Sequence, residues 1–158
     1  MVSQSLCYFA YGSNADPNRF QARVGEWLGR APAWLEGYRL RFASSVSSEG
    51  GGGAVIDEAE GSRVAGVLYE ITREQMERMD REEFDPARDV SRSGRRLTVT
   101  VSTEQGDRTA QAYTVTDDGG WCAPSATYLA HILRGLEAAG HSPEVIAAVR
   151  EIAAGSAR

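Results

Sequence analysis

The segment from Tyr8 to Asn14 reads Tyr-Phe-Ala-Tyr-Gly-Ser-Asn, and its residue types suit the binding of a small anion. An apolar run ends there in a turn, and Gly12 and Asn14 are residue types that tolerate unusual backbone angles. Successive N–H groups of such a turn can converge on one negative charge. Asp16 and Pro17 predict that a helix begins just afterwards, and its N-terminus would favour the same charge. The pattern therefore suits a carboxylate or phosphate site, but on its own it is more typical of a plain strand-to-helix turn.

A second candidate is the acidic run Asp80-Arg81-Glu82-Glu83. It closes a predicted helix that opens with a capping box, in which Thr72 and Gln75 satisfy each other's backbone N–H groups. A carboxylate in a pocket can serve as a general base and then as a general acid. Acidic helix ends are also commonly solvated faces, so the spacing alone leaves both interpretations open.

The elements that must position these groups are mixed in type. Strands are predicted over residues 6–11, 38–42, 53–57, 63–71, 97–101 and 111–116 from short apolar or alternating runs. Helices are predicted from Pro17, from Thr72 to about Glu82, over residues 125–138 and from Ser142 onward. The Ser- and Gly-rich stretch 44–53 is predicted to be a loop. We expect one α+β domain over residues 1–158, built around a curved or closed sheet.

The composition narrows the class of protein. The chain has 158 residues and a formal net charge of −5, which argues against a nucleic-acid or an anionic-membrane partner. No apolar run approaches the ~20 residues of a membrane span, and no secretory signal is visible. Two cysteines and two histidines make a zinc site of the usual ligand types improbable. We therefore expect a cytoplasmic protein with reduced thiols.

The Tyr8–Asn14 segment resembles the signature of the γ-glutamylcyclotransferase family. The resemblance continues in chain order through residues 52–56, 64–69, 79–83, 99–101 and 112–113 to Pro124–Tyr128, so that it covers about Leu6 to Tyr128. It implies a small closed mixed β-barrel flanked by helices. It also implies an enzyme, without a metal or another cofactor, that releases 5-oxoproline from γ-glutamyl amides by intramolecular attack.

The resemblance also implies roles for particular residues. Glu83, three residues after Asp80, matches the family's general base, and Glu82 is the neighbour most easily mistaken for it. The γ-glutamyl head group would be bound by Tyr8, Phe9, Ala10, Tyr11, Gly12, Ser13, Asn14, Gly53 and Tyr128. The implied partner is a small γ-glutamyl substrate, with no nucleic acid and no membrane, and the chain would be a monomer or a homodimer.

The chemistry explains why a single carboxylate can suffice. The α-amine of the substrate, with a pKa of ~8, is mostly protonated at neutral pH. Glu83 would take its proton and return it to the departing amine. The turn at Gly12–Asn14 would hold either the α-carboxylate or the γ-carbonyl oxygen, and the sequence leaves both open.

The chain departs from the family pattern immediately after the base. Phe84 stands where the family commonly has Gly, and the stretch 85–94 is longer than usual. The leaving group therefore stays open between an amino acid, an amine and a biosynthetic intermediate that loses a γ-glutamyl protecting group. Two alternatives from other classes are a non-catalytic binding module on the same fold and an amidohydrolase that releases free glutamate.

Overall fold

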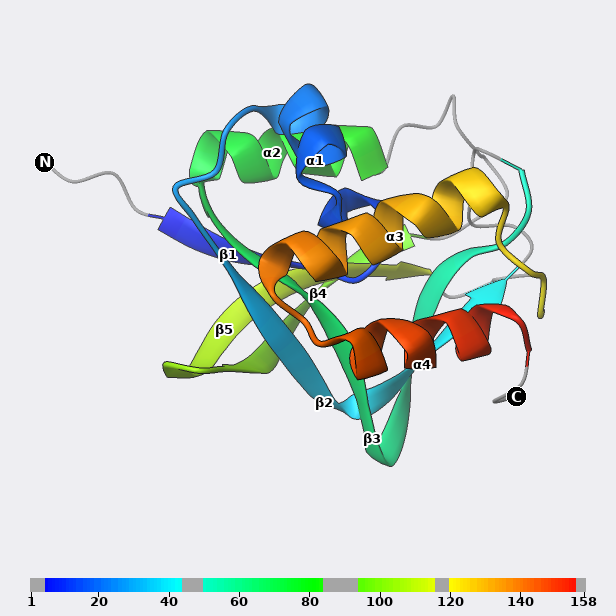
Figure 1. Ribbon diagram of the computed structural model, residues 1–158. Helices are drawn as coiled ribbons and strands as arrows, with labels where there is room; N and C mark the ends of the chain where they lie inside the picture. Colours follow the sequence, from blue (N-terminus) through cyan, green and yellow to red (C-terminus); the bar gives the residue numbers. More distant parts are fainter. Residues whose placement is uncertain (1–4, 44–49, 84–93, 116–119, 156–158) are drawn as a thin grey trace, which may run out of the picture.

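Five strands form a sheet that closes on itself (Figure 1). The computed structural model describes residues 5–43, 50–83, 94–115 and 120–155. The order around the ring is β1-β3-β2-β4-β5, with antiparallel neighbours except for a parallel contact between β1 and β5 at Tyr8 and Gln111. The predicted α+β fold with a closed mixed sheet and flanking helices is confirmed. The strands span Ser5–Ala10, Gly29–Ala43, Gly53–Thr72, Gly94–Thr103 and Gly106–Val115.

β3 is a single strand, so the prediction of two separate strands over residues 53–57 and 63–71 is wrong. Its pairing with β2 shifts register between Glu36 and Tyr38, where residues 59–62 of β3 lie opposite Gly37 alone. Gly61 in this bulge has a φ of +85°, which a glycine adopts without strain. The residues that look like a strand break therefore bend the strand without ending it.

The first two α-helices begin where their capping residues predict. α1, Pro17–Val24, is capped by Asp16, whose Oδ1 accepts a hydrogen bond from the N–H of Asn18 at 3.0 Å. α2, Arg73–Glu83, opens with the predicted capping box: Thr72 and Gln75 exchange side-chain and backbone hydrogen bonds at 3.0 and 3.1 Å. These local contacts fix the start of each helix.

The C-terminal part forms α3, Ala126–Ala139, and α4, Pro143–Ala153, with Ser125 and Ser142 as N-caps. Gly140 ends α3 with a left-handed φ of +105°. In Figure 1, α1 and α2 lie together beside one part of the sheet, and α3 and α4 follow one another across it. A short 3₁₀ helix, η1, Ser13–Ala15, follows β1 and packs against α3. No helix within the described ranges is long and apolar enough to cross a membrane.

β1 and Tyr11, the residue that follows it, contribute to both apolar clusters of the described residues, because successive side chains of an extended chain point to opposite faces. Phe9 and Tyr11 belong to the larger cluster, which extends to α3 and α4. Tyr8 and Ala10 belong to the smaller cluster, which lies under α1 and α2. The turn that follows β1 is thereby placed where the two clusters meet.

Candidate active site

The turn after β1 is a 3₁₀ turn with an ordinary backbone. The N–H of Ala15 donates to the carbonyl of Gly12 at 3.0 Å, and the N–H of Asp16 donates to the carbonyl of Ser13 at 3.2 Å. Gly12 has a φ of −103°, and no described residue other than glycine has a positive φ, so the turn does not use the left-handed conformation that Gly12 and Asn14 would tolerate. Among the described residues, the N–H groups of Ser13 and Asn14 donate to no backbone carbonyl, as expected for the first groups of a helical turn. Gly12 and Ser13 are half-buried, so this part of the turn is open to a small ligand.

The side chain of Asn14 connects this turn to the acidic end of α2. It is 5% exposed, and its Nδ2 lies 3.2 Å from Oε1 of Glu83 and 3.1 Å from the hydroxyl of Tyr8. Its Oδ1 is buried without a hydrogen-bond partner among the described residues. A carboxylate that accepts a hydrogen bond from a buried amide is held in one place. The structure thus brings Glu83 and the Gly12–Asn14 segment together.

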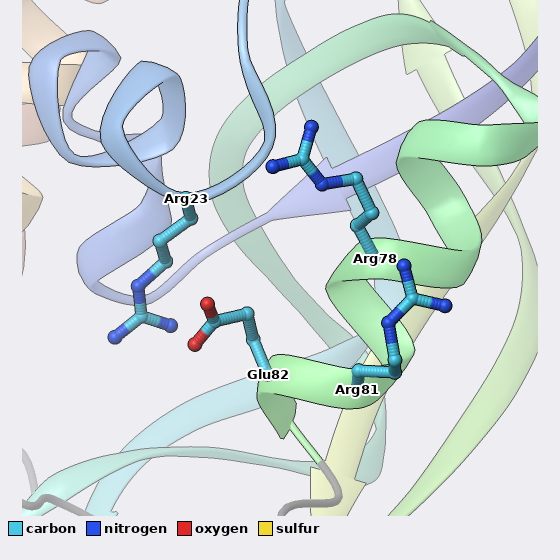
Figure 2. A pocket seen from close by; sticks show the side chains of 4 residues that line it. All are labelled: Arg23, Arg78, Arg81 and Glu82. Carbon is cyan, nitrogen blue, oxygen red and sulfur yellow. The ribbon is translucent and has the colours of Figure 1, made fainter.

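Glu83 and Glu82 differ in part of their surroundings, although Arg23 lies near both. Glu83 is the last residue of α2, and its side chain is 28% exposed. Glu82 lines a small pocket with Arg23, Arg78 and Arg81 (Figure 2). Of the two acids, Glu83 is the one that contacts the turn after β1 through Asn14.

Asp80 anchors the last turn of α2. One Asp80 oxygen lies 2.7 Å from Nη1 of Arg96 on β4, and the other accepts a hydrogen bond from the hydroxyl of Tyr113 on β5 at 2.6 Å. Asp80 and Glu83 are three residues apart and therefore project from neighbouring positions of the helix surface. The two strands thus fix the part of the helix that carries Glu83.

Tyr128 and the start of β3 complete the other side of the turn. The hydroxyl of Tyr128 accepts a hydrogen bond from the N–H of Ala54 at 3.0 Å, directly after the buried Gly53. A Cβ atom placed on Gly12 would lie 3.2 Å from the same hydroxyl, so the backbone there comes close to Tyr128. Gly52 must be glycine, because a Cβ would lie 1.9 Å from the carbonyl oxygen of Cys122. The segment before α3 thereby holds the start of β3 against the turn.

Three tyrosines around the site stay protonated: Tyr8, Tyr11 and Tyr113. Burial, followed by the charge of Glu83, raises the pKa of Tyr8 well above its usual value. Burial also raises the pKa of Tyr11, and the Tyr128 and Glu83 side chains raise it further. The pKa of Tyr113 is raised by burial and by its hydrogen bond to Asp80. The hydroxyl of Tyr11 donates to the carbonyl of Tyr113. These phenols are neutral hydrogen-bonding groups at physiological pH.

Comparison with known proteins identifies the family. The family model described as γ-glutamyl cyclotransferase, AIG2-like, matches residues 8–130. The chain belongs to this family. The match begins in β1 and ends in α3, so it spans the turn, Glu83 and Tyr128.

Individual relatives of the cyclotransferase family agree with this assignment. The chain is 30% identical over 121 residues to the γ-glutamylcyclotransferase of Bos taurus, a match that covers 72% of this chain and 61% of the bovine protein. A solved structure of a γ-glutamyl cyclotransferase superposes with a TM-score of 0.81 at 26% identity, covering 93% of this chain and 87% of the other. The structure of the human protein loc79017, described as uncharacterized, superposes with a TM-score of 0.79 at 27% identity and covers 94% of this chain and 88% of its own.

The structure separates the binding residues implied by the family resemblance into two groups. Gly12, Ser13 and Asn14 lie at the turn, and Tyr8 and Tyr128 reach it through their hydroxyls. The side chains of Phe9 and Ala10 are 0% and 1% exposed and lie in the two apolar clusters, so they offer a ligand no surface of their own. Tyr11 is buried too, at 7% exposure, as Tyr8 and Tyr128 are at 4% and 7%, and its hydroxyl donates to the carbonyl of Tyr113.

Three groups at this candidate site were missed by the sequence reasoning. The N–H of Ala54 and the hydroxyl of Tyr113 reach it from distant strands, and Arg23 reaches it from α1. Each comes from an element far along the chain, and no local motif marks them. Phe84 and the stretch 85–93 lie outside the described residues. The described His, Cys, Asp and Glu side chains form no group of three that could hold a metal ion.

Proposed function

We propose that this protein converts γ-glutamyl amides into 5-oxoproline and a free amine, with Glu83 as the only acid–base group. The observation that carries the proposal is the 3.2 Å contact between Nδ2 of Asn14 and Oε1 of Glu83, which places a partly buried carboxylate beside the turn after β1. The family match and the name of the bovine relative support the same chemistry.

The reaction needs no group beyond those of the substrate and one carboxylate. Glu83 takes a proton from the α-ammonium group of the substrate, and the freed nitrogen lone pair attacks the γ-carbonyl carbon. A new C–N bond closes the five-membered ring, and the C–N bond to the leaving amine breaks. The leaving nitrogen takes the proton from Glu83. The ring nitrogen then gives its second proton to the carboxylate, which passes it to the released amine, so that the amine leaves as an ammonium ion and Glu83 returns to its starting state. No water is consumed.

Holding the substrate in a bent conformation supplies much of the rate. Well-oriented intramolecular attack reaches effective molarities of ~10⁵ M or more. The half-buried turn at Gly12 and Ser13 would hold one end of the substrate through its N–H groups, either the α-carboxylate or the γ-carbonyl oxygen. An analogue without the α-carboxylate distinguishes the two: a raised KM with unchanged kcat indicates the carboxylate, and an unchanged KM indicates the carbonyl.

The substrate class that we propose is the γ-glutamyl amide of an amino acid or of another amine. Removal of a γ-glutamyl protecting group from a biosynthetic intermediate is the same reaction with a larger leaving group. Phe84 and the stretch 85–94, where the sequence departs from the family pattern, follow Glu83 directly along the chain, and a difference in leaving group would arise there.

Product analysis in H₂¹⁸O tests the proposal. A γ-glutamyl dipeptide, a γ-glutamyl amine and glutathione are each incubated with the protein, and the products are identified by mass spectrometry. Cyclisation gives 5-oxoproline without ¹⁸O, because no water enters the product. An amidohydrolase would give glutamate that carries ¹⁸O, and a binding module would give no product; either result overturns the proposal.

A further inference from the structure

Arg23 is a nearly buried cation beside Glu83. It lies in the last turn of α1, and its side chain is 12% exposed. Its Nη1 lies 3.9 Å from Oε1 of Glu83, the same oxygen that Nδ2 of Asn14 reaches at 3.2 Å. One carboxylate oxygen therefore faces both an amide donor from η1 and a guanidinium from α1.

The charges that α2 itself places near Glu83 oppose its ionisation. Glu83 ends α2, where the helix dipole places partial negative charge. Asp80 and Glu82 on the same helix add negative charge, and Asp80 is already paired with Arg96. Among the described residues, the neutral phenols of Tyr8, Tyr11 and Tyr113 lie near Glu83. The amide of Asn14 from η1 donates a hydrogen bond to its carboxylate, which favours the ionised form without adding charge.

The cations near this end of α2 differ in their placement. Figure 2 shows the guanidinium of Arg23 next to the carboxylate of Glu82, whereas Arg78 and Arg81 extend from α2 in another direction. Arg78 and Arg81 are exposed, so solvent screens their charges more strongly. Of the three arginines that line this pocket, Arg23 is thus the one that lies close to Glu83 and is largely shielded from solvent.

We propose that Arg23 is a positioning residue that keeps the Glu83 carboxylate ionised and oriented until the substrate delivers its proton. The proposal rests on the proposed function, in which Glu83 must start each cycle as the base. Once Glu83 is protonated, the attraction to Arg23 is lost, and this loss favours passing the proton on to the leaving amine. Arg23 touches neither substrate nor reacting atoms in this scheme.

The test is the pH dependence of kcat/KM for Arg23→Gln, with Arg78→Gln as the control for removing one positive charge from the same pocket. The acid limb of kcat/KM reports the ionisation of the free enzyme. Removing a cation about 4 Å away raises the pKa of a carboxyl group, so the acid limb of Arg23→Gln moves to higher pH by about one unit, allowing for partial exposure. In Arg78→Gln the acid limb stays at the wild-type pH. In Arg23→Lys, which keeps the positive charge, the acid limb returns most of the way to the wild-type pH.

A second readout does not depend on turnover. The carboxyl resonance of Glu83 is followed by ¹³C NMR in labelled protein and identified by its absence from Glu83→Gln. Its titration midpoint rises in Arg23→Gln by the same amount as the kinetic limb. An unchanged midpoint, or an equal rise in Arg78→Gln, overturns the role of Arg23. A wild-type protein that makes no 5-oxoproline overturns the proposed function, while the NMR titration still decides the role of Arg23.

Discussion

Replacing Asn14 by Ala removes the amide that joins the turn after β1 to Glu83. The substitution takes away the contacts of Nδ2 with Oε1 of Glu83 at 3.2 Å and with the hydroxyl of Tyr8 at 3.1 Å. A hydrogen bond to a charged group contributes about 1.5–3 kcal/mol. Glu83 is 28% exposed, so the lower end of that range applies, and kcat/KM falls about 10-fold at 1.4 kcal/mol per decade.

The assay is 5-oxoproline release by wild-type protein, Asn14→Ala and Asn18→Ala. Asn18 is exposed on α1, so Asn18→Ala is a matched truncation, and we expect it to keep the wild-type rate. Asn14 is 5% exposed, so its truncation also lowers the free energy of unfolding by about 1–3 kcal/mol. Thermal unfolding must therefore show that the variant is folded at the assay temperature.

Asn14→Asp sharpens the same test because it keeps the shape of the side chain. It places a second carboxylate next to Glu83, and two like charges so close raise the pKa of one of them strongly. The acid limb of kcat/KM then moves to higher pH. A folded Asn14→Ala protein with the wild-type kcat/KM, together with an unshifted Asn14→Asp profile, would refute the idea that Asn14 holds the base.

Three further substitutions probe the site and its frame. In Gly12→Ala, the new Cβ would lie 3.2 Å from the hydroxyl of Tyr128. Because the φ of Gly12 is −103°, we expect little change in thermal stability, but kcat/KM should fall by up to ~100-fold as the turn and Tyr128 are pushed apart. An unchanged kcat/KM would contradict the close approach of the turn to Tyr128. In Gly66→Ala, the Cβ would lie 2.5 Å from the ring of Phe9, so chemical denaturation should show a loss of about 1–3 kcal/mol without a change in the activity of the folded fraction. Burial raises the pKa of Asp16, but its hydrogen bonds, above all the one to His131, outweigh burial and leave this pKa below its usual value. The stabilisation by the ionised carboxylate is therefore present above the unfolded pKa of ~3.9 and is lost as the pH falls through the lower folded pKa. Equilibrium unfolding of Asp16→Asn should show a smaller loss of stability at acid pH, and an unaltered pH profile would contradict this role of Asp16.

Local sequence signals predicted the helix starts well. Asp16 with Pro17, Thr72 with Gln75, and Ser142 with Pro143 each mark a helix start, because capping depends on residues within one turn of each other. The long strand β3 was harder to predict. Its bulge at residues 59–62 contains the residue types of a turn, and only the partner strand β2 shows that the chain continues extended.

The candidate site was predictable only in part, for the same reason. The spacing of Asp80 and Glu83 and the segment ending in Asn14 stand out in the sequence. The contact between Asn14 and Glu83 joins residues 69 positions apart, and sequence reasoning assigned Asn14 to backbone geometry instead of to a side-chain contact. Arg23 carries no motif at all, since its nearness to Glu83 follows from how α1 packs against α2.

The central claim is that Glu83, and not its neighbour, is the base. The most direct measurement compares the rates of 5-oxoproline release by Glu83→Gln and Glu82→Gln, both confirmed as folded. We expect Glu83→Gln to lose at least ~100-fold, as for a general base, and Glu82→Gln to stay near the wild-type rate, because its side chain lies in the arginine-lined pocket. A Glu83→Gln variant with near wild-type activity, beside an inactive Glu82→Gln variant, would contradict the account.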